Sequence, residues 1–142
     1  MIPRLTILTL GVKDPEAARA FYTGLGLTVS EKSQGDMTIL DMNGLLLALY
    51  PFDKLAEDAT LEAPAELPAF RGLTLAWNLS SEAEVDAAVA QAEAAGATVV
   101  KRPQKVFWGG YSSYIKDPDG HLWELAYNPF MELDSDGRPT GY

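Results

Sequence analysis

The feature that most constrains the fold is a repeat: the same order of predicted strands and helix occurs twice along the chain. Residues 4–50 predict a strand, a helix and three short strands, and residues 71–129 predict the same order. The helix caps of the two copies, Asp14 and Ser81, occupy equivalent places in this order. A single copy would leave one face of its sheet bare, so the two copies must pair to bury it. The repeat therefore predicts an α+β fold: two tandem βαβββ modules that form curved mixed sheets around a central pocket.

Helix caps and turn residues mark the limits of the predicted elements. Asp14 can accept hydrogen bonds from the free amides at the start of the first helix. Ser81 and Glu84 form a capping box at the start of the second helix. Gly44 and Gly120 tolerate the positive φ of the hairpin turns before the last strand of each copy. These signals predict where each helix begins and where each last hairpin turns.

Two segments lie outside the repeat. Residues 51–70 are acidic and rich in alanine and proline, and they predict a connector with one turn of helix at residues 54–58. Residues 130–142 are polar and predict a loosely held C-terminal tail. We therefore expect a single domain over residues 1–129, made of two modules joined by the connector and followed by the tail.

Composition excludes several functional classes. At 142 residues and 47% hydrophobic, the chain can build a real core, but it has no apolar run long enough to span a membrane. The absence of cysteine excludes disulfides and thiolate chemistry. The net charge of −9 argues against binding the nucleic-acid backbone; it favours solubility, and it would favour a cationic ligand. The N-terminus shows no signal-peptide cleavage site, so we expect a cytoplasmic protein.

The segment Phe107–Pro129 contains the residue most in need of an explanation, Glu124. Strand alternation places Leu122, Glu124 and Ala126 on one face of the last predicted strand. A carboxylate between apolar neighbours is costly on a buried face unless another group compensates it. Glu124 is therefore the candidate catalytic residue, acting as a general base or as an anion for a cationic group. Alternatively, it accepts hydrogen bonds from neighbouring tyrosine, tryptophan or serine donors and has a structural role.

Aromatic and amide side chains are the candidate substrate-binding residues. They are Trp77, Trp108, Tyr111, Asn128 and Tyr50. Core packing is the alternative role for most of the aromatic ones. Trp108 precedes a glycine pair in a loop that is longer than its counterpart in the first module, so we expect a moving wall of the pocket; the alternative is a packed plug. Three basic residues precede this loop and could balance the negative charge of Glu124 or of an acidic ligand: Lys101, Arg102 and Lys105.

The paired modules, with LGVKDPEAARAFYTGLGL in the first and DPDGHLWELAYNP at the end of the second, resemble the vicinal oxygen chelate superfamily. This superfamily includes the glyoxalase, extradiol dioxygenase and bleomycin-resistance proteins. The resemblance covers about residues 4–129 and implies the fold more firmly than any one activity. In the metal enzymes of the family, four inward-facing side chains surround a divalent cation. The positions that match them here are Ile7, Ala48, Thr74 and Glu124.

This quartet predicts no bound metal and no other cofactor. Only Glu124 is a usual ligand, whereas such sites need three or four His, Glu or Asp side chains. His121 cannot complete the set, because it faces away from Glu124 on the strand. We therefore expect a protein that binds a small organic molecule, cationic or aromatic, in the manner of the drug-sequestering members of the family.

Two enzymatic alternatives remain open. One is a metal-dependent lyase or dioxygenase of the glyoxalase type, and the other is a metal-free lyase or isomerase that uses Glu124 as its base. In each case the expected partners are a small-molecule ligand and a second copy of the chain in a homodimer. Neither nucleic acid nor a membrane is expected as a partner.

Overall fold

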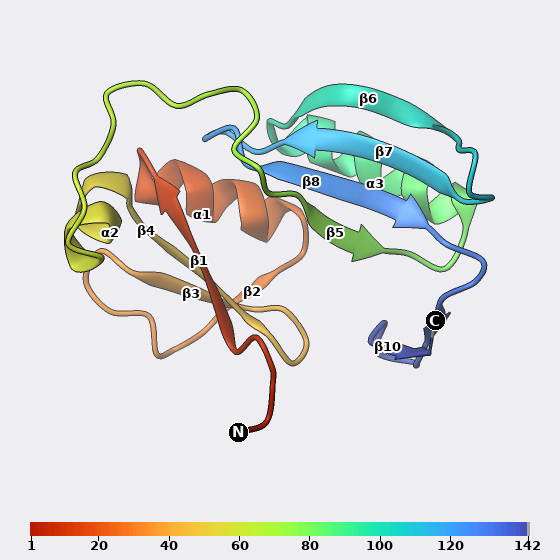
Figure 1. The fold of residues 1–142 in the computed structure, drawn as a ribbon, viewed down its shortest axis with the longest axis horizontal. Helices are drawn as coiled ribbons and strands as arrows, with labels where there is room; N and C mark the ends of the chain where they lie inside the picture. Colours follow the sequence, from red (N-terminus) through yellow and green to blue (C-terminus); the bar gives the residue numbers. More distant parts are fainter. Residues whose placement is uncertain (142) are drawn as a thin grey trace. The chain divides into compact units, whose positions relative to one another are not determined.

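The chain divides into two compact units, Met1–Arg71 and Gly72–Tyr142. The computed structural model describes residues 1–141, and each unit contains one four-stranded mixed sheet with its own long helix (Figure 1). The two predicted βαβββ modules are thus present in tandem, and the predicted α+β class is confirmed. No helix within the described residues is long and apolar enough to cross a membrane.

The first unit forms one sheet with the strand order β1-β4-β3-β2, in which only β1 and β4 run parallel. Its elements are β1 (Ile7–Val12), α1 (Pro15–Gly24), β2 (Thr28–Val29), β3 (Thr38–Asp41), β4 (Leu46–Pro51) and α2 (Phe52–Asp58). α1 packs on β4 and buries Ala18, Phe21 and Tyr22. The predicted cap is confirmed, because the Asp14 carboxylate accepts from the amides of Glu16 at 3.0 Å and Ala17 at 3.2 Å.

The helix α2 is longer than the single turn predicted for residues 54–58. It begins directly after β4, and it lies so close to β1 that a Cβ on Gly11 would meet the Phe52 ring at 2.7 Å. An ion pair between Lys54 and Asp36 joins α2 to the loop before β3. Because side chains alternate along a strand, α2 covers the end of the face on which Ile7 lies.

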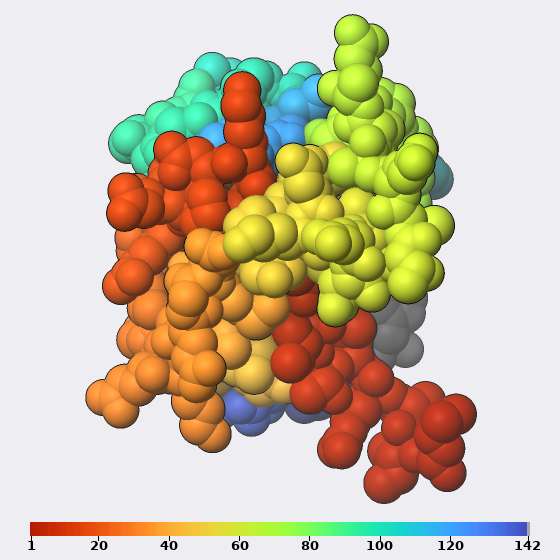
Figure 2. Space-filling view, turned by 90° about the vertical axis from the view of Figure 1, so that its left-hand side faces the viewer, coloured from red at the N-terminus to blue at the C-terminus, as the bar shows by residue number. Residues whose placement is uncertain are grey.

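The first residues of the chain precede β1 and carry apolar side chains into solvent. Figure 2 shows this segment in red, standing out from the rest of the first unit. Met1, Ile2 and Leu5 are all exposed, and Ile7 at the start of β1 is 47% exposed.

The second unit forms a sheet with the strand order β5-β8-β7-β6, and β5 and β8 are its only parallel pair. Its elements are β5 (Leu75–Asn78), α3 (Glu82–Ala95), β6 (Thr98–Lys105), β7 (Tyr111–Lys116), β8 (Leu122–Tyr127), β9 (Glu132–Leu133) and β10 (Pro139–Gly141). α3 packs on β6, β7 and β8 and buries Val85, Val89 and Ala92 (Figure 1). The core of this unit therefore lies between α3 and one face of the sheet.

Local hydrogen bonds fix the limits of the elements in the second unit. The Ser81 hydroxyl accepts from the amide of Glu84 at 3.1 Å, which confirms the predicted cap, and Gly96 ends α3 with a φ of 110°. Between β7 and β8, the Asp117 carboxylate accepts from the amides of Asp119 and His121, each at 2.9 Å. This turn sets the register of the β7–β8 hairpin and so decides which residues face Glu124.

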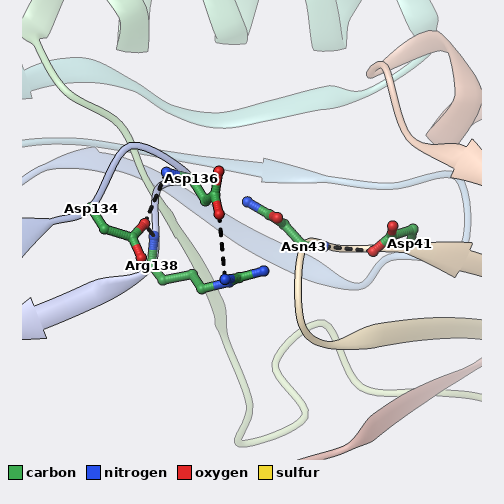
Figure 3. A network of polar contacts seen from close by, with 5 residues as sticks. All are labelled: Asp41, Asn43, Asp134, Asp136 and Arg138. Atoms are coloured by element: carbon green, nitrogen blue, oxygen red, sulfur yellow. Dashed lines mark hydrogen bonds and ion pairs between the residues drawn. The ribbon is translucent and has the colours of Figure 1, made fainter.

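The C-terminal segment, which the sequence predicts as a tail, contains local secondary structure. β9 and β10 form a two-stranded antiparallel ribbon. In its turn, the Asp134 carboxylate accepts from the amides of Asp136 and Arg138, each at 2.9 Å, and the Arg138 guanidinium lies 3.4 Å from the Asp136 carboxylate (Figure 3). In the first unit, the Asp41 carboxylate closes the turn before β4 in a similar way, by accepting from the amide of Asn43 at 2.8 Å (Figure 3). Short side-chain-to-backbone bonds thus order both turns.

Candidate functional site

Glu124 lies in a row of residues that crosses all four strands of the second sheet. On β8 its Cα partners are Ala76 of β5 and Tyr114 of β7, and the partner of Tyr114 on β6 is Lys101. Residues paired in this way point to the same face of a sheet. We call these four residues the carboxylate row.

The carboxylate row lies on the face of the sheet that α3 does not cover. The opposite face is identified by its bonds to α3: the Tyr111 hydroxyl donates to Asp86 at 2.8 Å, and Arg102 forms a bidentate pair with Glu93 at 2.7 and 2.8 Å. Glu124, Tyr114 and Lys101 are half-buried and Ala76 is exposed, so solvent reaches the row.

Two hydroxyl groups hold the Glu124 carboxylate in place. Ser112 donates to Oε1 at 3.0 Å, and Tyr114 donates to Oε2 at 3.1 Å. These bonds compensate the partly buried charge, which is the structural alternative that the sequence left open. A carboxylate oxygen has two lone pairs, so each oxygen keeps one acceptor position for a further donor. Glu124 can therefore accept hydrogen bonds from a ligand while it remains anchored to the sheet.

Tyr114 connects the carboxylate to a cation at the other end of the row. Burial, the negative charge of Glu124 and the hydrogen bond to it all raise the pKa of Tyr114 above its ordinary value of 10.0, so the hydroxyl remains a donor at neutral pH. On the other side, the Lys101 ammonium lies 5.9 Å from the centroid of the Tyr114 ring, within the range of a cation–π interaction. The row therefore presents an anion, an aromatic ring and a cation in sequence.

The structure separates the three basic residues that the sequence placed near Glu124. Only Lys101 faces the carboxylate row, because Arg102 turns to Glu93 of α3 and Lys105 is paired with Tyr111 on the α3 face. Within residues 1–141, Lys101 makes no ion pair. Its charge is therefore not matched by a carboxylate of the described chain.

Two of the predicted substrate-binding residues do not share a face with Glu124. Trp77 lies next to Ala76 on β5 and so points to the α3 face, where its ring centroid is 6.4 Å from that of Trp123. Tyr111 also points to the α3 face, as its bond to Asp86 shows. Strand alternation assigns both side chains to the packed side of the sheet.

Trp108 has the geometry of the packed alternative. Its turn is closed by bonds from the Gly109 amide to the Val106 carbonyl and from the Val106 amide to the Gly110 carbonyl, both 3.0 Å long. A Cβ on Gly110 would overlap the Trp108 ring, so the indole lies directly against this glycine. The neighbouring aromatic residue Phe107, rather than Trp108, is fully exposed. The glycine pair thus gives the indole a place to pack.

The last two predicted substrate-binding residues, Asn128 and Tyr50, lie in different units of the chain. Asn128 follows β8 with the same alternation as Glu124, but it is only 9% exposed and its side-chain oxygen accepts from the Phe130 amide at 3.0 Å. Tyr50 belongs to the first unit, where it is half-buried on β4 and shares a face with Ala48.

The residues at the metal positions implied by the family do not fit a divalent cation. Ile7 and Ala48 offer only hydrocarbon, and Thr74 is an exposed residue that precedes β5. Both oxygens of Glu124 already accept from hydroxyl groups. Within the described part of the chain, no three His, Cys, Asp or Glu side chains are grouped so that they could hold a metal ion. The donor set is too poor for the coordination that such ions require.

The sequence predicts the kind of donor that Glu124 meets, but not the donors themselves. Ser112 and Tyr114 face Glu124 because β7 and β8 pair in a register set by the turn at Asp117. That register could have been obtained by pairing residues outward from the turn. The position of Lys101 could not, because β6 shifts register on both sides of this residue.

Comparison with known proteins agrees with this fold. The family model described as "Glyoxalase/Bleomycin resistance protein/Dioxygenase superfamily" matches residues 4–125. A glyoxalase-related enzyme from Fulvimarina pelagi is 30% identical over 99% of both chains, with a TM-score of 0.87. A glyoxalase/bleomycin resistance protein/dioxygenase from Nocardioides is also 30% identical, over 100% of this chain and 90% of its own, with a TM-score of 0.75.

A more distant structure is lactoylglutathione lyase from Agrobacterium tumefaciens, 26% identical over 88% of this chain and 93% of its own, with a TM-score of 0.66. The comparison with curated proteins gave no match. The matched region includes the carboxylate row and most of both sheets. The chain therefore belongs to the glyoxalase/bleomycin resistance protein/dioxygenase superfamily.

Proposed function

We propose that this protein binds a small organic molecule with a cationic group, and that it does so without a metal, at the Glu124 face of the second sheet. The observation that carries the proposal is the Glu124 carboxylate itself. It is half-buried, it is anchored by Ser112 and Tyr114, and each of its oxygens keeps an acceptor position.

The anchoring bonds support binding of a cationic group. They fix the position of the carboxylate, and each oxygen keeps an acceptor position that a ligand ammonium can fill. The net charge of −9 adds a long-range attraction for cations. Ala76, next to Glu124 in the row, is small and exposed, and it leaves room for a ligand beside the carboxylate.

The metal-independent part of the proposal is supported by the donor chemistry. A cation of the kind that the family's metal enzymes hold would need ligands at Ile7 and Ala48, and neither side chain has a ligating atom. Glu124 would also have to give up its bonds to two hydroxyl groups in order to become a ligand.

Calorimetric titration with benzylamine and with its neutral analogue benzyl alcohol tests the proposal. Wild-type protein should prefer the amine, and Glu124→Gln, which keeps the shape but removes the charge, should weaken amine binding by about tenfold or more, as expected for the loss of a charged hydrogen bond. Glu132→Gln, which changes an exposed carboxylate on β9, is the matched control and should behave as wild type. Equal affinity of wild type and Glu124→Gln for benzylamine would refute the proposal.

A further inference from the structure

We infer that the ligand of the Glu124 face also carries an anionic group, which Lys101 binds, so that the ligand is a zwitterion. The inference rests on the proposed function for the cationic end of the ligand and adds a second recognition group at the other end of the carboxylate row.

Lys101 is a half-buried cation without a carboxylate partner. A half-buried ammonium is costly unless an opposite charge compensates it, and Lys101 makes no ion pair within residues 1–141. The chain has 20 acidic residues against 11 basic ones, and the next residue along the strand, Arg102, has a bidentate partner in Glu93. Lys101 is therefore held at the sheet surface with its charge available to a ligand.

Tyr114 positions Lys101 as well as Glu124. The Lys101 ammonium lies 5.9 Å from the centroid of the Tyr114 ring, and the hydroxyl of that ring is bonded to Glu124. A cation–π contact at a partly exposed site is weak, so it orients the side chain but leaves its charge available for a carboxylate. Tyr114 thus holds both charged groups of the row through one side chain.

The position of Tyr114 between the two charged side chains sets a minimum length for the ligand. Glu124 and Lys101 are separated by one intervening strand, so their Cα atoms lie about 10 Å apart, which is twice the distance between neighbouring strands. The carboxylate bonds the Tyr114 hydroxyl and the ammonium lies near the Tyr114 ring, so the ligand must reach from one to the other past this side chain. A molecule with an ammonium and a carboxylate on opposite ends of one six-membered ring is rigid and keeps its two charges apart, so it is a suitable probe.

Three probes and two variants test the inference. The probes are 4-(aminomethyl)benzoate, a zwitterion; benzylamine, the cation alone; and benzoate, the anion alone. We expect wild-type protein to bind the zwitterion at least about tenfold more tightly than benzylamine, as expected for one added charged hydrogen bond. Lys101→Met should abolish that advantage, and benzylamine should bind the variant no more weakly than wild type, because the change removes a positive charge that repels the amine. Lys105→Met, on the same strand but on the α3 face, should change neither affinity.

The outcomes separate the inference from the proposed function. If the zwitterion binds no more tightly than benzylamine, or keeps its advantage in Lys101→Met, the inference is overturned, while the proposed function stands as long as benzylamine binding depends on Glu124. If benzoate binds through Lys101 while benzylamine does not bind, the proposed function fails and only the anion site remains. If none of the three probes binds, both are overturned.

Discussion

Replacing Glu124 by alanine should destabilise the second unit, and the structure supplies the magnitude. The change removes the acceptor of two hydroxyl groups, Ser112 and Tyr114. Ser112 is only 2% exposed, so its stranded hydroxyl should cost about 1–3 kcal/mol, whereas the half-buried Tyr114 hydroxyl can turn to water at a smaller cost. The variant also no longer has to bury a charged carboxylate, and this gain in free energy offsets part of the cost. We expect a net loss of about 1–2 kcal/mol in the free energy of unfolding.

A double-mutant cycle with Ser112→Ala measures this cost directly. Removing the hydroxyl as well as its acceptor leaves no stranded donor, so Ser112→Ala should recover part of the loss caused by Glu124→Ala, with a coupling energy of about 0.5–3 kcal/mol. Urea denaturation followed by tryptophan fluorescence reports the second unit alone, because all three tryptophans, Trp77, Trp108 and Trp123, lie in it. Unchanged or increased stability of Glu124→Ala, or additive losses in the double variant, would refute the reasoning.

The remaining predictions concern pH, metal content, the Trp108 turn and the oligomeric state. The pKa of Tyr114 is raised in the folded protein, so the unfolded chain loses this proton first, and stability should be complete below about pH 10 and fall as the pH rises further. Tyr114→Phe should flatten that fall in urea denaturation; equal pH profiles for Tyr114→Phe and wild type would contradict the assignment. Elemental analysis of protein purified without chelator should find no stoichiometric divalent metal, and a content near one Zn, Ni, Mn or Fe per chain would show that the metal positions are wrongly assigned. Trp108→Phe should leave the affinity for benzylamine unchanged, because the indole packs on Gly110; a large loss of affinity would restore the moving-wall interpretation. We propose a homodimer, supported by the exposed apolar residues before β1; a sedimentation mass of one chain at tens of micromolar would rule it out.

The parts of the fold that could be predicted are those with local causes. The caps at Asp14 and Ser81 and the hairpin turns depend on residues a few positions apart, and they appear where the sequence placed them. The sequence predicts too short a helix at α2, because this helix packs against the backbone at Gly11, a contact between residues distant in sequence. The C-terminal ribbon depends on Asp134, whose carboxylate bonds within a turn that has the composition of a polar tail.

In the candidate site, the features that follow from strand alternation and from the cost of burying a charge could also be predicted. Alternation along β8 correctly separates Glu124 from Trp123, and the need for a compensating donor follows from the cost of a buried charge. The same alternation along β5 and β7 is enough to assign Trp77 and Tyr111 to the α3 face, where their contacts lie. The position of the Trp108 side chain could not be predicted in this way, because a glycine pair permits both an open loop and a packed turn.

A register shift in β6 determines which basic residue shares a face of the sheet with Glu124, and no sequence pattern in β6 predicts this shift. Val99 is paired with Ile115, and if pairing continued without interruption, Val100 would stand opposite Tyr114 and Lys101 would point to the α3 face. The register shift after Val99 instead places Lys101 opposite Tyr114. Bulges of this kind re-aim side chains at the edges of sheets and beside functional sites, and β6 is an edge strand of its sheet. The pairing of one anion with one cation across the Tyr114 ring is therefore a product of strand register rather than of composition. It follows that Lys101 in this chain should determine which ligands are bound beside Glu124.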